Sequence, residues 1–310
     1  MSLDNTTPNR LPAFLALIAA ASIWGATAAI MKFTLITVPP FTLALIRFGC
    51  AAILLYPLVF GKLAIQVKDL PTIFFAGLSG IGIHIAFFFW GLKLTTALNA
   101  GIIIASTPLF TLLFAHFFLN ERLKKNFMVA SLFGIAGIGL IIGKDFGSNG
   151  ISLSPLGDLF ILLAIISFVT YETITKRLFA TYKPTVITWY AFVIGACFFF
   201  PFALYESLTL PNWTTNISTQ VMLGILYGIL FSSFAAYNLW EWGLSKVSES
   251  RVGFFFYLDP VVSTIAAVAI LGEKITLAFI LGSVLIFLGL ILAEGHLPYH
   301  HLHKPANGPR

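Results

Sequence analysis

The residues of this sequence best suited to chemistry are ionisable side chains that stand inside long apolar runs. Asp259 directly precedes Pro260, and an ionised carboxylate at bilayer depth costs about 2.5 to 3.5 kcal/mol on insertion scales. Asp259 therefore needs a partner, a proton or a hydrated cavity. It could bind a cation or amine, carry a proton, or form an ion pair with Arg47 or another interior base. His84 could exchange protons near neutral pH or donate to a substrate, or it could only hydrogen-bond to a neighbouring helix.

Three further charged residues have both a functional and a structural interpretation. Glu172 is followed four residues later by Lys176, a spacing that favours a helical ion pair, and it is also a candidate proton carrier. Glu241 stands between two tryptophans near the end of an apolar run, where an interfacial anchor is expected rather than a gate. Arg47 could attract an anionic group, but no anion-binding motif lies beside it, so we expect a structural role.

Aromatic rings and amides within the apolar runs complete the candidate substrate site, because they can stack on a solute or hydrogen-bond to it. The thirty-two phenylalanines are too numerous to choose among. The predicted cavity residues are Trp24, His84, Asn99, Tyr171, Tyr190, Asn238, Tyr257 and Asp259, and the candidates for proton coupling are His84, Asp259 and Glu172.

Two prolines lie near the middle of apolar runs, Pro108 and Pro260. Each removes one helical hydrogen bond and frees the carbonyl four residues earlier, which belongs to Ile104 or Phe256. Non-helical backbone at membrane depth is tolerated where it lines a cavity, and paired interruptions indicate a transporter site. We therefore predict helix breaks or hinges at these prolines, with a simple packing kink as the alternative.

The composition places all of these residues in a membrane. The chain has 310 residues, of which 58% are hydrophobic and 10% charged, and its mean hydropathy is +0.95. A soluble protein is excluded by these values. Apolar runs bounded by charge, Pro or Gly predict ten spans near 11–35, 40–60, 70–92, 97–119, 126–143, 156–178, 185–206, 218–244, 250–271 and 276–294.

The distribution of positive charge predicts how the chain sits in the bilayer. If the spans alternate, thirteen of the 18 Lys and Arg residues flank them on the side of the N-terminus. The positive-inside rule then predicts that both termini are cytoplasmic in a plasma (inner) membrane. The net charge of +6 thus reflects topology, and nucleic-acid binding is disfavoured. Neither the two cysteines nor the histidines of the tail, 296–310, are assigned a metal.

The chain repeats itself. Pairs at a constant offset of 144 positions are Lys32 and Lys176, Pro40 and Pro184, and Pro57 and Pro201; pairs at an offset of 152 include Trp90 and Trp242, Gly91 and Gly243, Pro108 and Pro260, Glu121 and Glu273, and Gly137 and Gly289. Each half holds five spans, so the second half must enter the membrane from the opposite side. This predicts an inverted repeat over 1–147 and 148–295, with a substrate site near the midplane.

The run Ala21-Ser-Ile-Trp-Gly-Ala-Thr-Ala-Ala-Ile-Met-Lys32 resembles the first span of the EamA branch of the drug/metabolite transporter superfamily. Thr107-Pro108 through Glu121, and Leu258-Asp-Pro260 through Glu273, are similar to its fourth and ninth spans. The resemblance implies ten helices in two inverted five-helix repeats, with the fifth and tenth helices peripheral to a central cavity. It also implies structural roles for Glu121 and Glu273, and transport of small metabolites or drugs, commonly outward. The carboxylate of Asp259 departs from the uncharged residue that is usual before this proline.

We therefore predict an all-α polytopic membrane protein that acts as a secondary transporter by alternating access. Its partners are a small-molecule substrate such as an amino acid, amine or drug-like solute, the lipid bilayer, and a proton or counter-solute; export is favoured over import. The alternative is an uncoupled facilitator or an exchanger that imports a metabolite. No cofactor is expected. The sequence lacks His-Glu-x-x-His, Gly-x-Ser-x-Gly and Walker motifs, so an enzyme is disfavoured.

One pair of glycines in the fifth predicted span bears on helix packing. Gly139 and Gly143 form a Gly-x-x-x-Gly pair, which predicts close helix packing.

Overall fold

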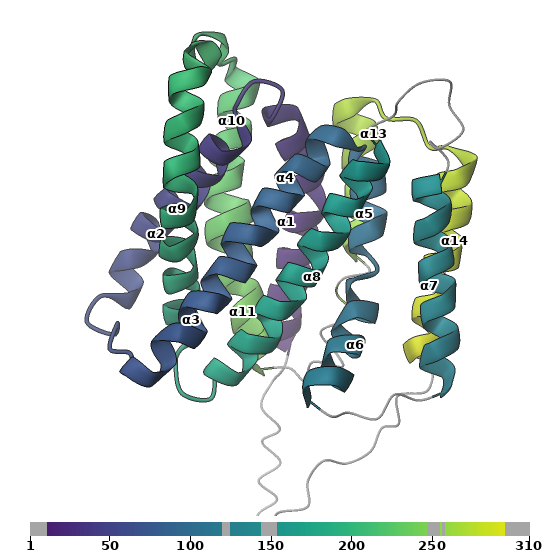
Figure 1. The fold of residues 1–310 in the computed structure, drawn as a ribbon, viewed down its shortest axis with the longest axis horizontal. Helices are drawn as coiled ribbons and strands as arrows, with labels where there is room; N and C mark the ends of the chain where they lie inside the picture. The colour runs from purple at the N-terminus through teal and green to yellow at the C-terminus, as the bar shows by residue number, and fades with distance from the viewer. Residues whose placement is uncertain (1–10, 120–124, 144–153, 247–254, 256–257, 295–310) are drawn as a thin grey trace, which may run out of the picture.

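The regular structure is helical throughout the residues that the computed structural model describes, which are 11–119, 125–143, 154–246, 255 and 258–294 (Figure 1). Helices are expected because backbone polar groups in hydrocarbon must be satisfied within their own segment. The first half forms α1 (Leu11–Thr34), α2 (Pro40–Val59), α3 (Leu70–Gly77), α4 (His84–Leu94), α5 (Ala97–Ile104), α6 (Thr107–Leu119) and α7 (Lys125–Gly143). The second forms α8 (Ser154–Leu178), α9 (Pro184–Thr209), α10 (Thr219–Tyr227), α11 (Ala236–Lys246), α13 (Leu258–Leu271) and α14 (Leu277–Glu294).

These helices coincide with the ten predicted spans. Six segments of the described chain are long and apolar enough to cross a membrane. The remaining apolar helices are shorter: α5 with the start of α6, the whole of α13, and parts of α7 and α14. The predicted all-α polytopic membrane fold is therefore confirmed.

Two spans contain a feature that the apolar pattern did not predict. The third span, Val67–Leu94, and the eighth, Thr219–Lys246, each have 28 residues. Each passes through a stretch of wider π-helix, η2 (Leu78–Ile83) in the third and η4 (Gly228–Ala235) in the eighth. Such stretches often occur at functional sites.

The two halves run in opposite directions and repeat each other's contacts. In Figure 1 the chain rises from α3 to α4 and descends from α10 to α11. A side chain on Gly91 of α4 would meet Gly157 and Ile161 of α8, and one on Gly243 of α11 would meet Ala13 and Leu17 of α1. These two glycine contacts are related by the sequence offsets, so each half packs its third span against the first span of the other.

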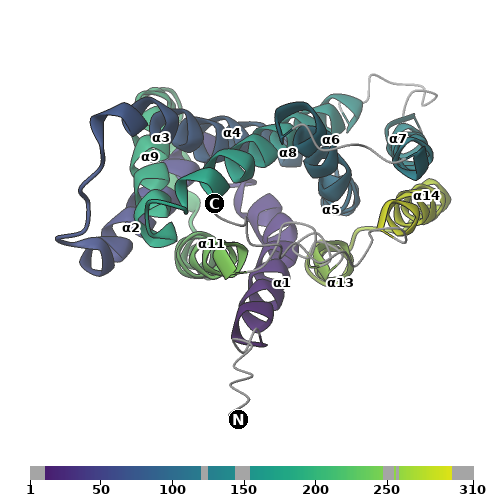
Figure 2. The ribbon, with the colours of Figure 1, turned by 90° about the horizontal axis from the view of Figure 1, so that it is seen from below.

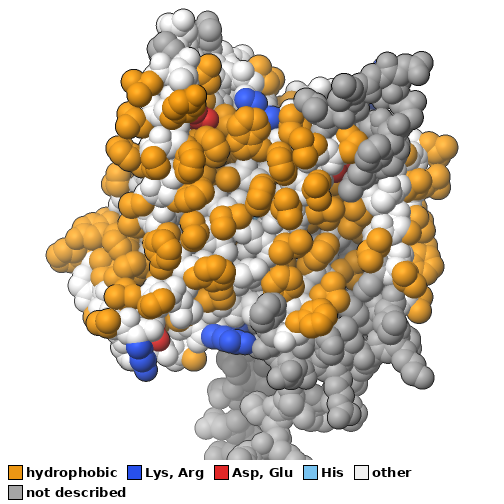
Figure 3. All heavy atoms as spheres, viewed as in Figure 1, with side chains coloured by type: hydrophobic (Ala, Val, Ile, Leu, Met, Phe, Trp, Pro, Cys, Tyr) orange, Lys and Arg blue, Asp and Glu red, His pale blue; other side chains and the backbone are white. Residues whose placement is uncertain are grey.

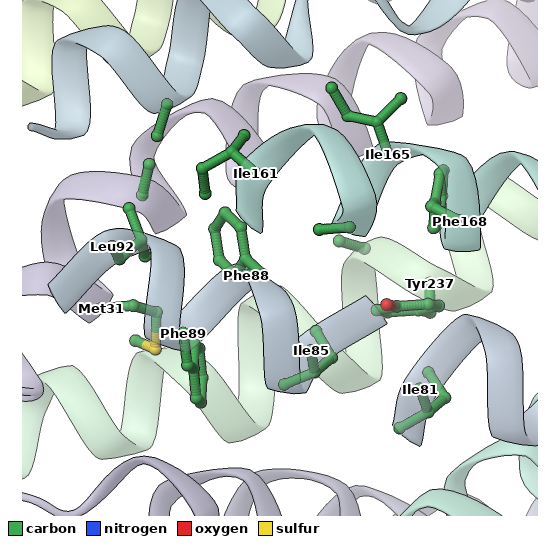
Figure 4. Close-up of a cluster of buried hydrophobic side chains, with 14 of the residues drawn as sticks. Met31, Ile81, Ile85, Phe88, Phe89, Leu92, Ile161, Ile165, Phe168 and Tyr237 are labelled. Carbon is green, nitrogen blue, oxygen red and sulfur yellow. The ribbon is translucent and has the colours of Figure 1, made fainter. Parts of the chain in front are cut away.

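The core lies between the halves, and the outer surface is apolar. Figure 4 shows Phe88 and Phe89 of α4 beside Met31 of α1 and Ile161 of α8. On the outside, Figure 3 shows hydrophobic side chains over the whole visible face, with charged groups near its upper and lower margins. An exposed apolar area of this extent is expected of a surface in contact with lipid.

The fifth and tenth spans, α7 and α14, pair at one edge of the bundle (Figure 2). They approach closely at Gly137, where a Cβ atom would lie 2.6 Å from the Gly282 carbonyl oxygen. The predicted packing residue Gly139 is instead exposed, and nothing lies within 4 Å of the position of its Cβ. The Gly-x-x-x-Gly prediction was therefore wrong at Gly139, because that residue faces away from α14.

This difference gives a matched test. We expect Gly137→Ala to lower the thermal midpoint in detergent, because overpacking of this kind costs about 1–3 kcal/mol. Gly139→Ala should leave the midpoint unchanged or raise it, since alanine favours helix over glycine. Equal midpoints for the two variants would contradict the described α7–α14 contact.

Candidate functional site

A cavity of about 80 Å³ lies in the middle of the bundle between the two halves. Both repeats contribute to it, through α1, α2, α4, α8, α11, α13, the π segment η4 and the α5–α6 junction. The residues that line it are Trp24, Thr27, Arg47, His84, Ile85, Phe88, Ile104, Thr107, Ile165, Phe168, Ser232, Tyr237 and Asp259. Three predicted cavity residues, Trp24, His84 and Asp259, thus meet at one site.

Equivalent positions of the two halves contribute similar aromatic side chains to the cavity lining but differ in charge. Trp24 and Phe168 occupy equivalent positions and contact each other edge to face, with ring centroids 5.8 Å apart. Thr107 and Asp259 are also equivalent, so a hydroxyl faces the cavity from one half and a carboxylate from the other. Charge at this site is therefore specific to one side of the pseudo-symmetric cavity.

Arg47 of α2 is the basic group of the cavity and is 1% exposed. Its Nε donates to the Gly228 carbonyl and the Ser233 hydroxyl at 3.3 and 3.2 Å, and its Nη2 donates to the Ser232 hydroxyl at 2.9 Å. These acceptors all lie in the π segment η4. Nη1 has no hydrogen-bond partner among the described residues. The guanidinium group is therefore bound to η4 through Nε and Nη2, while Nη1 remains available as a donor.

Asp259 is the acidic group of the cavity and is 7% exposed. It lies in the first turn of α13 against α1, where a Cβ on Gly25 would come within 2.8 Å of the Asp259 carbonyl oxygen and 3.1 Å of its Oδ1. No hydrogen bond or ion pair to its carboxylate is formed within the described part of the chain. The ion pair with Arg47 that the sequence left open is absent between these two residues, although both face the cavity.

Both prolines lie next to cavity residues. Pro108 is the second residue of α6, and the chain turns at Ala105 and Ser106, between α5 and α6. The freed Ile104 carbonyl accepts a hydrogen bond from the Thr107 hydroxyl at 2.5 Å. Pro260 is the third residue of α13. The structure thus interrupts the fourth span at cavity depth, as expected of a break that Pro108 creates.

His84 begins α4 directly after the π segment η2. Its Nδ1 lies 2.9 Å from the Ala164 carbonyl of α8, which is consistent with an Nδ1–H donor, and its ring packs against Phe88 and Phe168. The neighbouring-helix hydrogen bond left open by the sequence is therefore formed, while the ring still borders the cavity.

Several predicted cavity residues lie elsewhere in this structure. Asn99 donates to Asp158 and Thr95 near one end of the bundle. Tyr190 donates to the Leu63 carbonyl, and Asn238 donates to the Phe234 carbonyl of its own helix. Glu273 accepts from the backbone amides of Ala97 and Leu98 and so caps α5 rather than its own helix. Tyr257 and Glu121 lie outside the described residues.

Each end of the bundle is held by a lysine at equivalent repeat positions. Lys32, near the end of α1, donates to the carbonyls of Leu92 and Thr95 at the end of the third span. Lys176, near the end of α8, donates to the Leu244 carbonyl at 2.8 Å. The offsets that relate Lys32 to Lys176 also relate Leu92 to Leu244. We call these opposite ends of the bundle the Lys32 end and the Lys176 end.

A cluster of aromatic and acidic side chains lies between the cavity and the Lys176 end. The Trp240 indole donates to Glu172 Oε1 at 2.8 Å, which links α11 to α8. The neighbouring Glu241 and Tyr171 are completely buried, at 0% exposure. The predicted interfacial position of Glu241 was therefore wrong, because its side chain points into the bundle.

A second hollow, of about 400 Å³, lies outside the bundle between the loops at Lys62–Gln66 and Thr181–Lys183. There the Tyr182 hydroxyl donates to Asp69 at 2.6 Å, and this hydrogen bond raises the pKa of Tyr182. The hollow is open and peripheral, so the smaller central cavity remains the candidate substrate site.

Sequence reasoning expected a structural role for Arg47, which also lines the cavity, and missed four further polar residues of the lining: Thr27, Thr107, Ser232 and Tyr237. Thr107 could have been found, because it stands at the repeat position of Asp259 and also precedes a proline. No comparable pattern in the sequence identifies the other three. Whether a single Thr, Ser or Tyr in an apolar run faces the cavity depends on the rotation of its helix, which the sequence does not show.

Comparison with known proteins agrees with this architecture. The family model described as the EamA-like transporter family matches residues 11–143 and again 155–294. A solved crystal structure has a similar fold, with a TM-score of 0.64 over 91% of this chain and 96% of that chain at 22% identity.

The similar proteins of known sequence are named as transporters. An uncharacterized transporter of Archaeoglobus fulgidus is 28% identical over 87% of this chain and 94% of its own length. The uncharacterized transporter YyaM of Bacillus subtilis is 31% identical, with coverage of 87% and 90%. A probable amino-acid metabolite efflux pump of Escherichia coli is 25% identical, also with coverage of 87% and 90%. The chain therefore belongs to the EamA-like transporter family.

Proposed function

We propose that this transporter exports small zwitterionic metabolites of the amino-acid type by alternating access around the central cavity. The observation that carries this proposal is the pair of opposite charges in the cavity lining, Arg47 and Asp259. Each is buried at membrane depth, and they do not pair with each other. A charge in this position is expensive unless a ligand or water meets it.

A solute with both charges would satisfy both groups. Its carboxylate would accept from Nη1 of Arg47, the donor without a partner, and from the Ser232 hydroxyl beside it. Its ammonium group would donate to Asp259, and its side chain would meet the rings of Trp24 and Phe168. The printed name of the Escherichia coli relative, a probable amino-acid metabolite efflux pump, supports the same substrate class and the outward direction.

The cavity must change size during this cycle. A volume of about 80 Å³ holds a few water molecules, whereas typical small-molecule sites occupy several hundred Å³. The lysine contacts supply an arrangement suited to such a change. Lys32 closes one end against α4 and Lys176 closes the other against α11. Release of one contact while the other remains would expose the cavity to one side at a time.

Substrate class is tested with purified protein in liposomes and radiolabelled amino acids, amines and organic acids. We expect flux of amino acids in the wild type. Asp259→Asn should raise the apparent KM for amino acids roughly 10-fold or more, because a hydrogen bond between charged groups is lost. Monocarboxylic acids, which need only Arg47, provide the internal control. Equal effects of Asp259→Asn on amino acids and on monocarboxylic acids would contradict the proposed ammonium contact.

A second test separates binding by Arg47 from a structural role. Removal of a buried charge is costly when it leaves an opposite charge uncompensated, but Arg47 has no acidic partner among the described residues, and its acceptors in η4 are two hydroxyls and one carbonyl. Arg47→Met should therefore abolish amino-acid flux while the thermal midpoint in detergent stays the same or rises. A large fall in the midpoint would show that the guanidinium is a structural part of the η4 contact.

The lysine contacts are tested by distances between spin labels in a chain whose native cysteines, Cys50 and Cys197, are replaced by Ala. Labels at Ile36→Cys and Lys93→Cys report the Lys32 end, and labels at Thr181→Cys and Lys246→Cys report the Lys176 end. Lys176→Met should increase the open population at the Lys176 end roughly 10-fold or more, since a charge-assisted hydrogen bond is removed.

Lys32→Met should do the same at the Lys32 end, so each variant serves as the control for the other. If both variants open the same end, or neither opens an end, the two contacts do not close the cavity.

A further inference from the structure

The cluster at the Lys176 end contains a completely buried carboxylate. Glu241 is 0% exposed, and neither of its carboxylate oxygens has a hydrogen-bond partner among the described residues. The Tyr171 hydroxyl, which faces it from α8, is likewise buried and unpartnered within the described chain. An ionised carboxylate buried in this way is far more costly than the neutral acid.

Packing alone does not require an acid at this position. The repeat equivalent of Glu241 is Phe89, 152 positions earlier, which is also buried, at 1% exposure. Likewise Trp240 is equivalent to Phe88. One half of the pseudo-symmetric bundle therefore fills this place with an apolar ring, and the other half carries an ionisable group there.

The groups around Glu241 are already engaged with other partners. From α8, Glu172 accepts from the Trp240 indole, and Lys176 donates to the Leu244 carbonyl while its charge also acts on Glu241. On α11 itself, Tyr237 lies one turn earlier and borders the cavity, and its charged neighbours are Arg47, Glu241 and Glu172.

Among the residues that the structure describes, the other elements packed against α11 place no further charged side chain at Glu241. On α1 the charged side chain is Lys32, which is bound at the opposite end. On α9, Tyr190 is turned to Leu63, and Glu206 accepts from the Phe41 and Thr42 amides near the Lys32 end.

We propose that Glu241 is a proton-binding site of this transporter, protonated while the Lys176 end is closed and ionised when that end opens to water. This inference rests on the proposed alternating access. As a neutral acid, Glu241 can donate to the Tyr171 hydroxyl and accept from it in turn. Opening separates α8 from α11 at the Lys176–Leu244 and Glu172–Trp240 contacts, so water reaches the carboxyl group and takes its proton.

The consequence is that the Lys176 end closes only after Glu241 binds a proton again from the water on that side. An acidic medium at this end therefore favours the closed form, and an alkaline medium favours the open form. Glu241→Gln, which resembles the neutral acid in shape and charge, should remain closed over the whole range.

The test uses the full chain in lipid nanodiscs with spin labels at Thr181→Cys and Lys246→Cys, in the background without native cysteines. As the pH rises, we expect the distance distribution of the wild type to shift to longer values, and we expect this shift to be lost in Glu241→Gln. The matched controls are Asp259→Asn and His84→Gln, which remove the rival titrating groups of the cavity. Both controls should retain the pH-dependent shift.

Infrared difference spectra assign the proton directly. In the Asp259→Asn background, which removes the other buried carboxyl group of the cavity, the carbonyl band of a protonated carboxyl group should be present at neutral pH and should be lost when Glu241→Gln is added. The proposal is overturned if the double variant keeps the band, if Glu241→Gln keeps the pH-dependent distance change, or if either control variant abolishes that change. Neither measurement requires a substrate, so a failure to transport amino acids would reject the proposed function and leave this result standing.

Discussion

The hydrocarbon core of the bilayer contains no water, so every buried polar group of this bundle must find its partner within the protein. Most do so across helices. Glu206 of α9 accepts from the backbone amides that begin α2, and Glu273 accepts from those that begin α5. The few groups left without a partner in the described chain are therefore conspicuous: Nη1 of Arg47, the carboxylate of Asp259 and the Tyr171–Glu241 pair. They lie in and beside the cavity, where a solute or a proton can serve as their missing partner.

The duplication supplies a symmetric scaffold, and single residues make it directional. The glycine contacts, the π segments and the terminal lysines all occur twice, once in each half. The charges in and beside the cavity occur only once. Arg47 is equivalent to Ala191, Asp259 to Thr107 and Glu241 to Phe89. The apolar framework is thus similar toward both membrane faces, whereas the single charges allow solute and proton to bind differently from the two sides.

Much of the fold followed from the sequence, because hydropathy and the constant offsets report span number and repeat directly. Side-chain direction did not follow. Glu241 was expected at the membrane interface and Gly139 in a helix contact, and both expectations failed because the rotation of a helix about its axis is set by tertiary packing. For the cavity, Trp24, His84 and Asp259 were identified by residue type and depth. Asn99 and Tyr190 met the same criteria, yet their partners lie near the ends of the bundle.

The π segments of the third and eighth spans bear on the evolutionary origin of the two halves. A π segment generally contains one more residue per turn than the helix around it, so it shifts the face presented by everything that follows. Here the two spans have the same length, and the offset of 152 positions relates their first residues as well as their last. An insertion made separately in each half would have had to occur twice at the same depth. The common arrangement indicates that the extra residue was already present in a single five-helix ancestor, before that ancestor was duplicated and paired with an inverted copy of itself.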